Sequence, residues 1–132
     1  MFIDIHTHLP QYDDVELDGI IQRWKSNKVK YVVSAGTTIN DSIKSINLSK
    51  RYKCILSGIG LHPSDLNSNW KNDLQEIKKL SNNKIVMISE IGLDYQESSP
   101  DKDIQIEVFE YQIQLAIEKK LPIVFHTRNA MD

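Results

Sequence analysis

The sequence lacks the usual features of secreted and membrane proteins. It has one cysteine, Cys54, so no disulfide can form within the chain, and we expect a reducing, cytoplasmic location. No run approaches the roughly 18 consecutive apolar residues of a membrane span. The first residues, MFIDIHTHLP, contain neither the basic nor the apolar region of a signal peptide. We therefore expect no membrane among the partners of this protein.

An excess of charge of one sign is also absent. The 132 residues include 16 Lys and Arg against 18 Asp and Glu, which gives a formal net charge of -2. Net charge therefore provides no general attraction for nucleic acid, and any phosphate-bearing partner has to be held by local chemistry. With 40% hydrophobic residues, the composition is that of a globular domain of ordinary size.

Short apolar runs alternate with helical patterns along the chain. Five runs are predicted to be strands, at residues 2–6, 29–35, 54–60, 85–89 and 123–126. Between them, apolar residues recur at spacings of three, four and seven, which predicts four amphipathic helices. In the fourth helix, Ser99 is predicted to be the N-cap and Pro100 the first helical residue. This alternation indicates βαβ units and a parallel sheet, in either a doubly wound fold or a (β/α)8 barrel.

The number of predicted strands is too small for a complete barrel. A (β/α)8 barrel has eight strands and typically about 250 residues. An arc of five strands would leave two open edges and an apolar interior without cover. If the fold is a barrel, the sequence therefore represents part of one.

Residues that can bind metal ions follow several of the predicted strands. His6 and His8 are two residues apart at a strand end, so their imidazoles project to the same side. Neutral imidazoles suit Zn, Fe and Ni ions, although a His-x-His pair is also found in ordinary surface loops. Glu90 follows an apolar run, where a buried carboxylate is unfavourable unless it is paired or bound to a cation. Its alternative role is that of a capping or salt-bridging residue.

Three further polar residues follow the third and fifth predicted strands. His62 and His126 each come after an apolar run, where a single histidine is more often structural than a ligand. Arg128 can pair with a carboxylate or hold a phosphate bidentately. Because the carboxyl ends of parallel strands meet at one rim, all these side chains are expected to lie together. Such a collection suits one or two divalent cations that activate water for hydrolysis.

These motifs resemble those of the TatD-like metal-dependent hydrolases, a family within the amidohydrolase-like TIM barrels. The matching stretches are IDIHTHL at 3–9, GLHP at 60–63, EIGLDY at 90–95 and a segment at 109–128 that ends in LPIVFHTR. They occur in the family order and cover nearly the whole chain. PHP-type phosphoesterases also begin with His-x-His, but EIGLDY and LPIVFHTR fit the TatD pattern better.

The resemblance implies a fold and an activity. The fold is α/β, a TIM-type (β/α)8 barrel, and residues 1–132 would be the N-terminal portion of this single domain, with about five strands and four helices. The activity is divalent-metal-dependent hydrolysis of phosphodiester bonds, as in a deoxyribonuclease of the 3′–5′ exonuclease type. The expected substrate is DNA or another phosphoester.

The resemblance also implies roles for individual residues. Two divalent ions (Mg, Mn or Zn) would be bound, with His6 and His8 on the first, His126 on the second, and Glu90 as the catalytic residue that bridges both. His62 and Arg128 match positions that contact the substrate. Asp94 belongs to the motif and is expected only to support the ligands.

The sequence departs from the family pattern in two ways. Ser64 stands where the family often has a second histidine, so one substrate contact is not expected here. The family's later histidine and aspartate, which complete the metal site, have no counterpart up to Asp132. We therefore expect a complementary C-terminal segment. The alternative is a catalytically inactive half-barrel that acts as a binding or assembly partner, or is a remnant.

Overall fold

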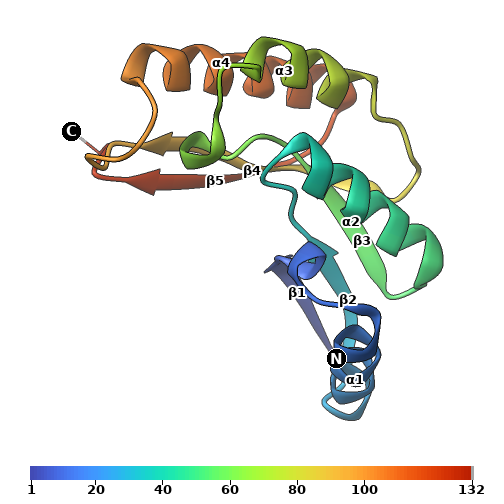
Figure 1. The fold of residues 1–132 in the computed structure, drawn as a ribbon. Helices are drawn as coiled ribbons and strands as arrows, with labels where there is room; N and C mark the ends of the chain where they lie inside the picture. Colours follow the sequence, from blue (N-terminus) through green and yellow to red (C-terminus); the bar gives the residue numbers. More distant parts are fainter. Residues whose placement is uncertain (132) are drawn as a thin grey trace.

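A parallel sheet of five strands organises the residues that the computed structural model describes, which are 1–131. The strands are β1 (Phe2–Thr7), β2 (Val29–Ser34), β3 (Ile55–Ile59), β4 (Ile85–Asp94) and β5 (Ile123–Arg128). The helices are α1 (Asp14–Ser26), α2 (Ile39–Arg51), α3 (Trp70–Lys79) and α4 (Lys102–Lys119), with short 3-10 helices η1 (Leu9–Gln11) and η2 (Pro63–Asp65). Neighbouring strands follow chain order and each pair is parallel. The helices lie on one side of the curved sheet, so the fold is a half-barrel (Figure 1).

The core lies between the sheet and the helices, in two clusters. In the larger one, Ile88 of β4 shares a cluster with Ile77 of α3 and Leu115 of α4, and all three are almost fully buried. In the smaller one, Leu17 of α1 lies with Val32 of β2. Burial of one such aliphatic side chain stabilises the fold by about 1.5–3 kcal/mol. The helices are therefore fixed on the sheet by apolar packing on this face.

The concave face and the two edge strands are much less covered. On β1, Phe2, Ile3 and Ile5 are 65%, 55% and 58% exposed, and Phe125 on β5 is 62% exposed. Ile3 pairs with Tyr31. The side chain of the next residue, Val32, packs against α1, and side chains alternate along a strand. The side chains of Tyr31 and Ile3 therefore lie on the opposite, concave face. The open edges and the uncovered apolar interior expected from the strand count are thus present.

The start of α4 differs from the sequence prediction. Asp101, and not Ser99, is the N-cap, and its side chain accepts hydrogen bonds from two backbone N–H groups of the first turn. The hydroxyl of Ser99 instead donates to the buried carboxylate of Asp94, over 3.1 Å, because a buried acceptor requires donors. The prediction that Pro100 is the first helical residue is also wrong, since it precedes the cap. No helix within residues 1–131 is long and apolar enough to cross a membrane.

The fourth strand is longer than predicted, which changes the position of Glu90. The sequence suggested an end at Ser89, but β4 continues to Asp94 because this segment pairs with β5. The register shifts between Ile88 and Ile91. Glu90 therefore lies within β4, in the irregular part of the ladder, and does not follow the strand.

Candidate metal centre

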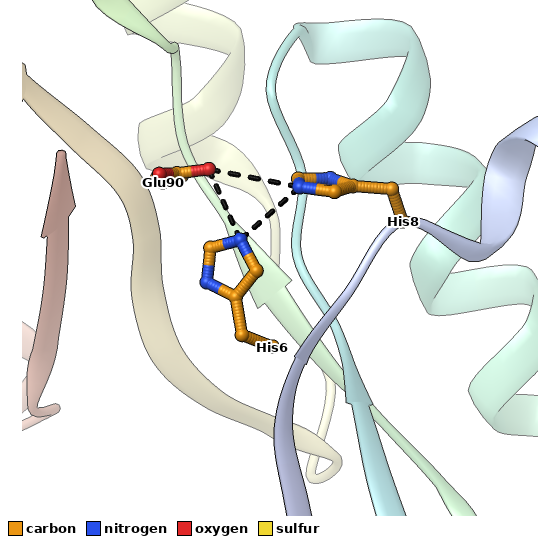
Figure 2. Close-up of side chains that lie close together, drawn as sticks. All are labelled: His6, His8 and Glu90. Atoms are coloured by element: carbon orange, nitrogen blue, oxygen red, sulfur yellow. Dashed lines mark hydrogen bonds and ion pairs between the residues drawn. The ribbon is translucent and has the colours of Figure 1, made fainter.

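His6, His8 and Glu90 meet at the carboxyl end of β1, with their polar atoms pointing toward one another (Figure 2). The Nε2 atoms of His6 and His8 are 3.1 Å apart. Oε2 of Glu90 is 3.2 Å from the first and 3.7 Å from the second. The predicted His-x-His pair thus lies beside the predicted carboxylate, although 82 positions separate Glu90 from His8 in the chain.

The spacing and chemistry of these atoms fit one divalent ion. Ligand atoms with bond lengths of about 2.0–2.2 Å to a shared ion lie roughly 3–4 Å apart. The three observed separations, from 3.1 to 3.7 Å, fall in this range. Two imidazoles and a carboxylate are also a donor set that Zn and related ions accept.

Backbone contacts place the two ends of this cluster. Thr7, between the histidines, donates its hydroxyl hydrogen to the carbonyl oxygen of Val33 over 2.9 Å, which ties the end of β1 to β2. The N–H of Glu90 donates to the carbonyl oxygen of Gly36 over 2.7 Å. The side chains of His6 and His8 remain 34% and 40% exposed, whereas that of Glu90 is 13% exposed. The cluster is therefore open to solvent from the histidine side.

The second oxygen of Glu90 faces another histidine. Oε1 is 3.5 Å from Nδ1 of His126, and Nε2 of His126 is 3.1 Å from Oδ2 of Asp94. Because the Asp94 carboxylate can only accept, a neutral His126 ring has its proton on Nε2 and presents the lone pair of Nδ1 toward Glu90. A carboxylate that fixes the tautomer of a histidine in this way is a common support for a metal ligand.

Asp94 is the most strongly held carboxylate of the site. Its side chain is fully buried and accepts hydrogen bonds from Nη2 of Arg128 at 2.6 Å and from Nε at 3.0 Å. Ser99 and the backbone N–H of Gln96 also donate to it. Arg128 is the main cause that keeps the pKa of Asp94 well below its usual range. The guanidinium predicted to contact substrate is therefore engaged with Asp94 in this structure.

His62 reaches the cluster from the loop after β3. One of its ring nitrogens lies within 4.8 Å of ligand atoms of Glu90 and His126, and its ring centroid is 4.5 Å from that of His126. The N–H of Ser64 donates to Nδ1 of His62 over 3.2 Å. Partial burial lowers the pKa of His62, which favours a neutral ring. A neutral ring whose Nδ1 accepts has its proton on Nε2, so His62 is a donor there.

A glycine allows β4 and β5 to approach at this point. Gly92 has φ of 145°, and a Cβ at this position would overlap the carbonyl oxygen of His126. Gly92 also pairs with His126 in the ladder. Glycine is therefore required for the close approach that brings Glu90 and Asp94 beside His126.

Two buried glutamines of α4 support the site, and the sequence analysis assigned a role to neither, although Gln112 lies in the matching segment at 109–128. Gln105 bonds both backbone polar groups of Asp94, at 2.7 and 2.8 Å. Gln112 does the same for Leu61, at 2.7 and 3.1 Å, next to His62. Little in the sequence could have identified them, because α4 is only weakly amphipathic: Ile106 and Ile117 are exposed while Gln105 and Gln112 are buried.

The fold and this cluster define the class of the protein: part of a TIM-type β/α barrel with a histidine–carboxylate site at the carboxyl ends of its strands. Comparison with known families makes this specific. A family model described as TatD related DNase matches residues 3–132. The chain belongs to this family, as its motifs predicted.

Individual similar proteins agree with this assignment. The uncharacterized metal-dependent hydrolase YabD of Bacillus subtilis is 41% identical over 135 residues, which cover 100% of this chain and 52% of YabD. The 3'-5' ssDNA/RNA exonuclease TatD of Salmonella typhimurium is 33% identical over 86% of this chain and 44% of its own length. The crystal structure of YJJV, a TatD homolog from Escherichia coli, has a TM-score of 0.81 at 26% identity, over 97% of this chain and 51% of YJJV. The chain thus spans about half the length of these proteins, and the predicted half-barrel is confirmed.

Proposed function

We propose that the protein is a divalent-metal-dependent hydrolase of phosphodiester bonds. The observation that carries this proposal is the position of Glu90, which presents one oxygen to His6 and His8 and the other to His126. A carboxylate with histidines on both sides is suited to bridge two ions. Two-ion sites are typical of enzymes that hydrolyse phosphoesters.

Each residue has a distinct role in this proposal. His6, His8 and Oε2 of Glu90 would hold one divalent ion, of Mg, Mn or Zn, while Nδ1 of His126 and Oε1 of Glu90 would hold a second. Bound there, such ions would supply Lewis-acid activation of water and neutralise negative charge at phosphorus. Asp94 keeps the proton of His126 on Nε2 and so keeps Nδ1 available.

His62 is proposed to contact the substrate and not a metal ion. Because Ser64 occupies Nδ1, the protonated Nε2 is a hydrogen-bond donor suited to a phosphoryl oxygen. Arg128 would act indirectly, since its guanidinium holds Asp94. In this proposal His62 keeps its predicted role as a substrate contact. Arg128, which was predicted to contact the substrate directly, is a positioning residue instead.

The proposed substrate is nucleic acid, and the proposed reaction is removal of nucleotides from a 3′ end. The support for this is the family and the similarity to a protein named as a 3'-5' exonuclease of single-stranded DNA and RNA. DNA is the first substrate to test. Other phosphoesters of similar charge remain the alternative within the same chemistry.

We further propose that residues 1–132 are the N-terminal portion of one barrel domain. The exposed apolar residues of β1 and β5 support a complementary segment that pairs with both edges. The same exposure also favours the second candidate function, an inactive half-barrel that binds another chain. Hydrolysis distinguishes these candidates, because only the first requires turnover.

Glu90→Gln in the full-length protein is the direct test. The amide retains the shape of the side chain but lacks the negative charge that two ions would share, so we expect hydrolysis of a single-stranded oligonucleotide in Mn²⁺ to fall by about 10³-fold or more. Glu97→Gln, in the loop after β4, is the matched control and should keep full activity. Circular dichroism should show both variants folded. Full activity of Glu90→Gln would refute the proposed role of this residue.

A further inference from the structure

The basic side chains are concentrated at the end of the half-barrel opposite the histidine–carboxylate cluster. Of the 16 lysines and arginines, 12 lie in the segments 23–30, 50–53, 78–84 and 119–120, and these segments contain no Asp or Glu. Each begins in the last turn of a helix and leads toward the next strand. Because the strands are parallel, these segments lie at the ends away from the arrowheads (Figure 1). We call this surface the basic face.

Local stabilisation explains part of this charge. Basic residues in the last turn interact favourably with the negative end of a helix dipole. In addition, Lys84 donates to backbone carbonyl oxygens of Ser49 and Tyr52 at the end of α2. Lys119 donates to the carbonyl oxygen of Leu80. Ion pairs with acidic residues of other segments engage three more basic residues, Arg51 with Asp14, Lys78 with Glu118 and Lys79 with Glu76. All these side chains have structural roles that require no ligand.

Four other lysines of the basic face lie outside helix last turns and have no such role. Within residues 1–131, the ammonium groups of Lys28, Lys53 and Lys120 form no hydrogen bond or ion pair, and that of Lys30 lies only over the ring of Tyr31. All four lysines are exposed. Their charges are therefore available to a partner.

Two of these lysines occupy backbone conformations that favour glycine. Lys28 has φ of 61° and Lys120 has φ of 55°, each at the end of a helix. Glycine is the usual residue at such positions because a Cβ is sterically unfavourable there. The chain keeps a positive charge at both places although the backbone is strained, which the fold alone does not require.

A cavity opens among these charges. It has a volume of about 490 Å³, and its lining includes Trp24, Cys54, Lys25, Lys28 and Lys30. Most of its wall is apolar, with the lysines as its charged groups. Apolar walls with a few convergent polar groups are typical of ligand sites. An indole beside ammonium groups is the arrangement that takes a stacked base and its phosphates.

We propose that the basic face binds single-stranded nucleic acid, with phosphates on the lysines and a base in the cavity beside Trp24. The choice of nucleic acid among polyanions rests on the proposed function. The six residues of β1, at about 3.3 Å each, place the face roughly 20 Å from the histidine–carboxylate cluster. The face would thus hold a part of the strand remote from the hydrolysed bond. An anionic membrane fits less well, because Trp24 is partly buried, packs against the apolar core and lines a cavity.

The test compares two triple variants with the same change in net charge. They are K25E/K28E/K30E, on the basic face, and K44E/K71E/K102E, at exposed helical positions elsewhere. Binding of a fluorescein-labelled single-stranded 20-mer to the full-length protein is measured by anisotropy, with EDTA present so that metal ions do not contribute. We expect the basic-face variant to bind at least about tenfold more weakly and to lose about 2 from the slope of log K against log salt. The control should change less than threefold.

Glycine substitutions separate binding from folding. Lys28→Gly and Lys120→Gly remove a charge and relieve the strained conformation, so these variants should be at least as stable as the parent. Each should nevertheless bind the oligonucleotide about two- to fivefold more weakly. If both glycine variants and the basic-face triple variant bound the oligonucleotide as tightly as the parent does, the proposal would be overturned.

The base in the cavity has its own readout. The difference in emission between the full-length parent and its Trp24→Phe variant is the contribution of the indole in the cavity. The oligonucleotide should quench its fluorescence, whereas unchanged emission at saturation would refute the contact with Trp24.

Further outcomes distinguish the alternatives. Equal weakening by the two triple variants would mean that overall charge, and not the basic face, controls binding. Retention on phosphatidylcholine–phosphatidylglycerol vesicles without oligonucleotide binding would identify a lipid surface and overturn the choice of nucleic acid. Glu90→Gln should bind the oligonucleotide normally in EDTA. If this variant also retained hydrolysis, the proposed role of Glu90 in hydrolysis would be refuted, whereas the proposal that the basic face binds nucleic acid would still be supported.

Discussion

The two sides of Glu90 are held in different ways. On one side, His6 and His8 are placed by strand geometry, and more than a third of each side chain is exposed. On the other side, His126 is fixed by Asp94, which is fully buried and bonded to Arg128 and to Ser99. The first side depends on the backbone of one strand, whereas the second depends on a network that links β4, β5 and α4. The same substitution should therefore affect function and stability differently on the two sides.

The largest effect on activity without an effect on stability is expected at His8. Removal of a proposed ligand in His8→Ala should lower kcat/KM for oligonucleotide hydrolysis by about 10²-fold or more. Because the side chain is 40% exposed, the free energy of unfolding in EDTA should change by less than about 0.5 kcal/mol. Urea unfolding and initial rates measure the two quantities. A loss of stability as large as that expected for Asp94→Asn would contradict the proposed difference between the two sides of Glu90.

Asp94→Asn should affect both quantities. Loss of the carboxylate that fixes the His126 tautomer should reduce metal affinity or activity by about 10–100-fold. It also leaves Arg128 without its charge partner, so the free energy of unfolding should fall by about 2–3 kcal/mol. Metal titration and urea unfolding of the same preparation test this pair of effects. An unchanged stability would show that the network does not hold the second side.

The dependence of stability on pH sharpens the same comparison. The pKa of Asp94 is held below that of the unfolded chain, mainly by Arg128, so its contribution is present above about pH 4 and is lost as pH falls through the folded pKa. The difference in unfolding free energy between parent and Asp94→Asn should thus stay nearly constant from pH 7 to 5 and shrink below pH 4. Urea unfolding at pH 7, 5, 4 and 3 measures it. A difference that disappears between pH 7 and 5 would contradict this assignment.

The sequence was most informative where a short spacing determines geometry. His6 and His8 could be predicted to lie on one side because they are two residues apart at a strand end. The alternation of apolar runs likewise predicted the parallel strands and the open edges. In both cases the cause is local, and neither the register nor a distant partner has to be known.

The remaining features depend on contacts between distant segments. Ser99 bonds to Asp94 and therefore does not cap α4 as predicted. Pairing with β5 makes β4 continue past Glu90. Both features depend on the register of these two strands. The role of Gln112 depends on which loop lies under α4. The net charge of -2 also did not reveal that the basic residues gather at one end, because a total charge does not say where the charged residues lie.

The number of divalent ions held by the full-length protein tests the central claim most directly. Manganese bound at saturation, measured by equilibrium dialysis and elemental analysis, should be two ions per chain in the parent. His126→Ala should retain one ion, and so should a variant with both His6→Ala and His8→Ala, because each variant lacks the histidine ligands on one side of Glu90. A parent that binds no manganese, or variants that bind as much as the parent, would contradict the claim that Glu90 is shared between two ions.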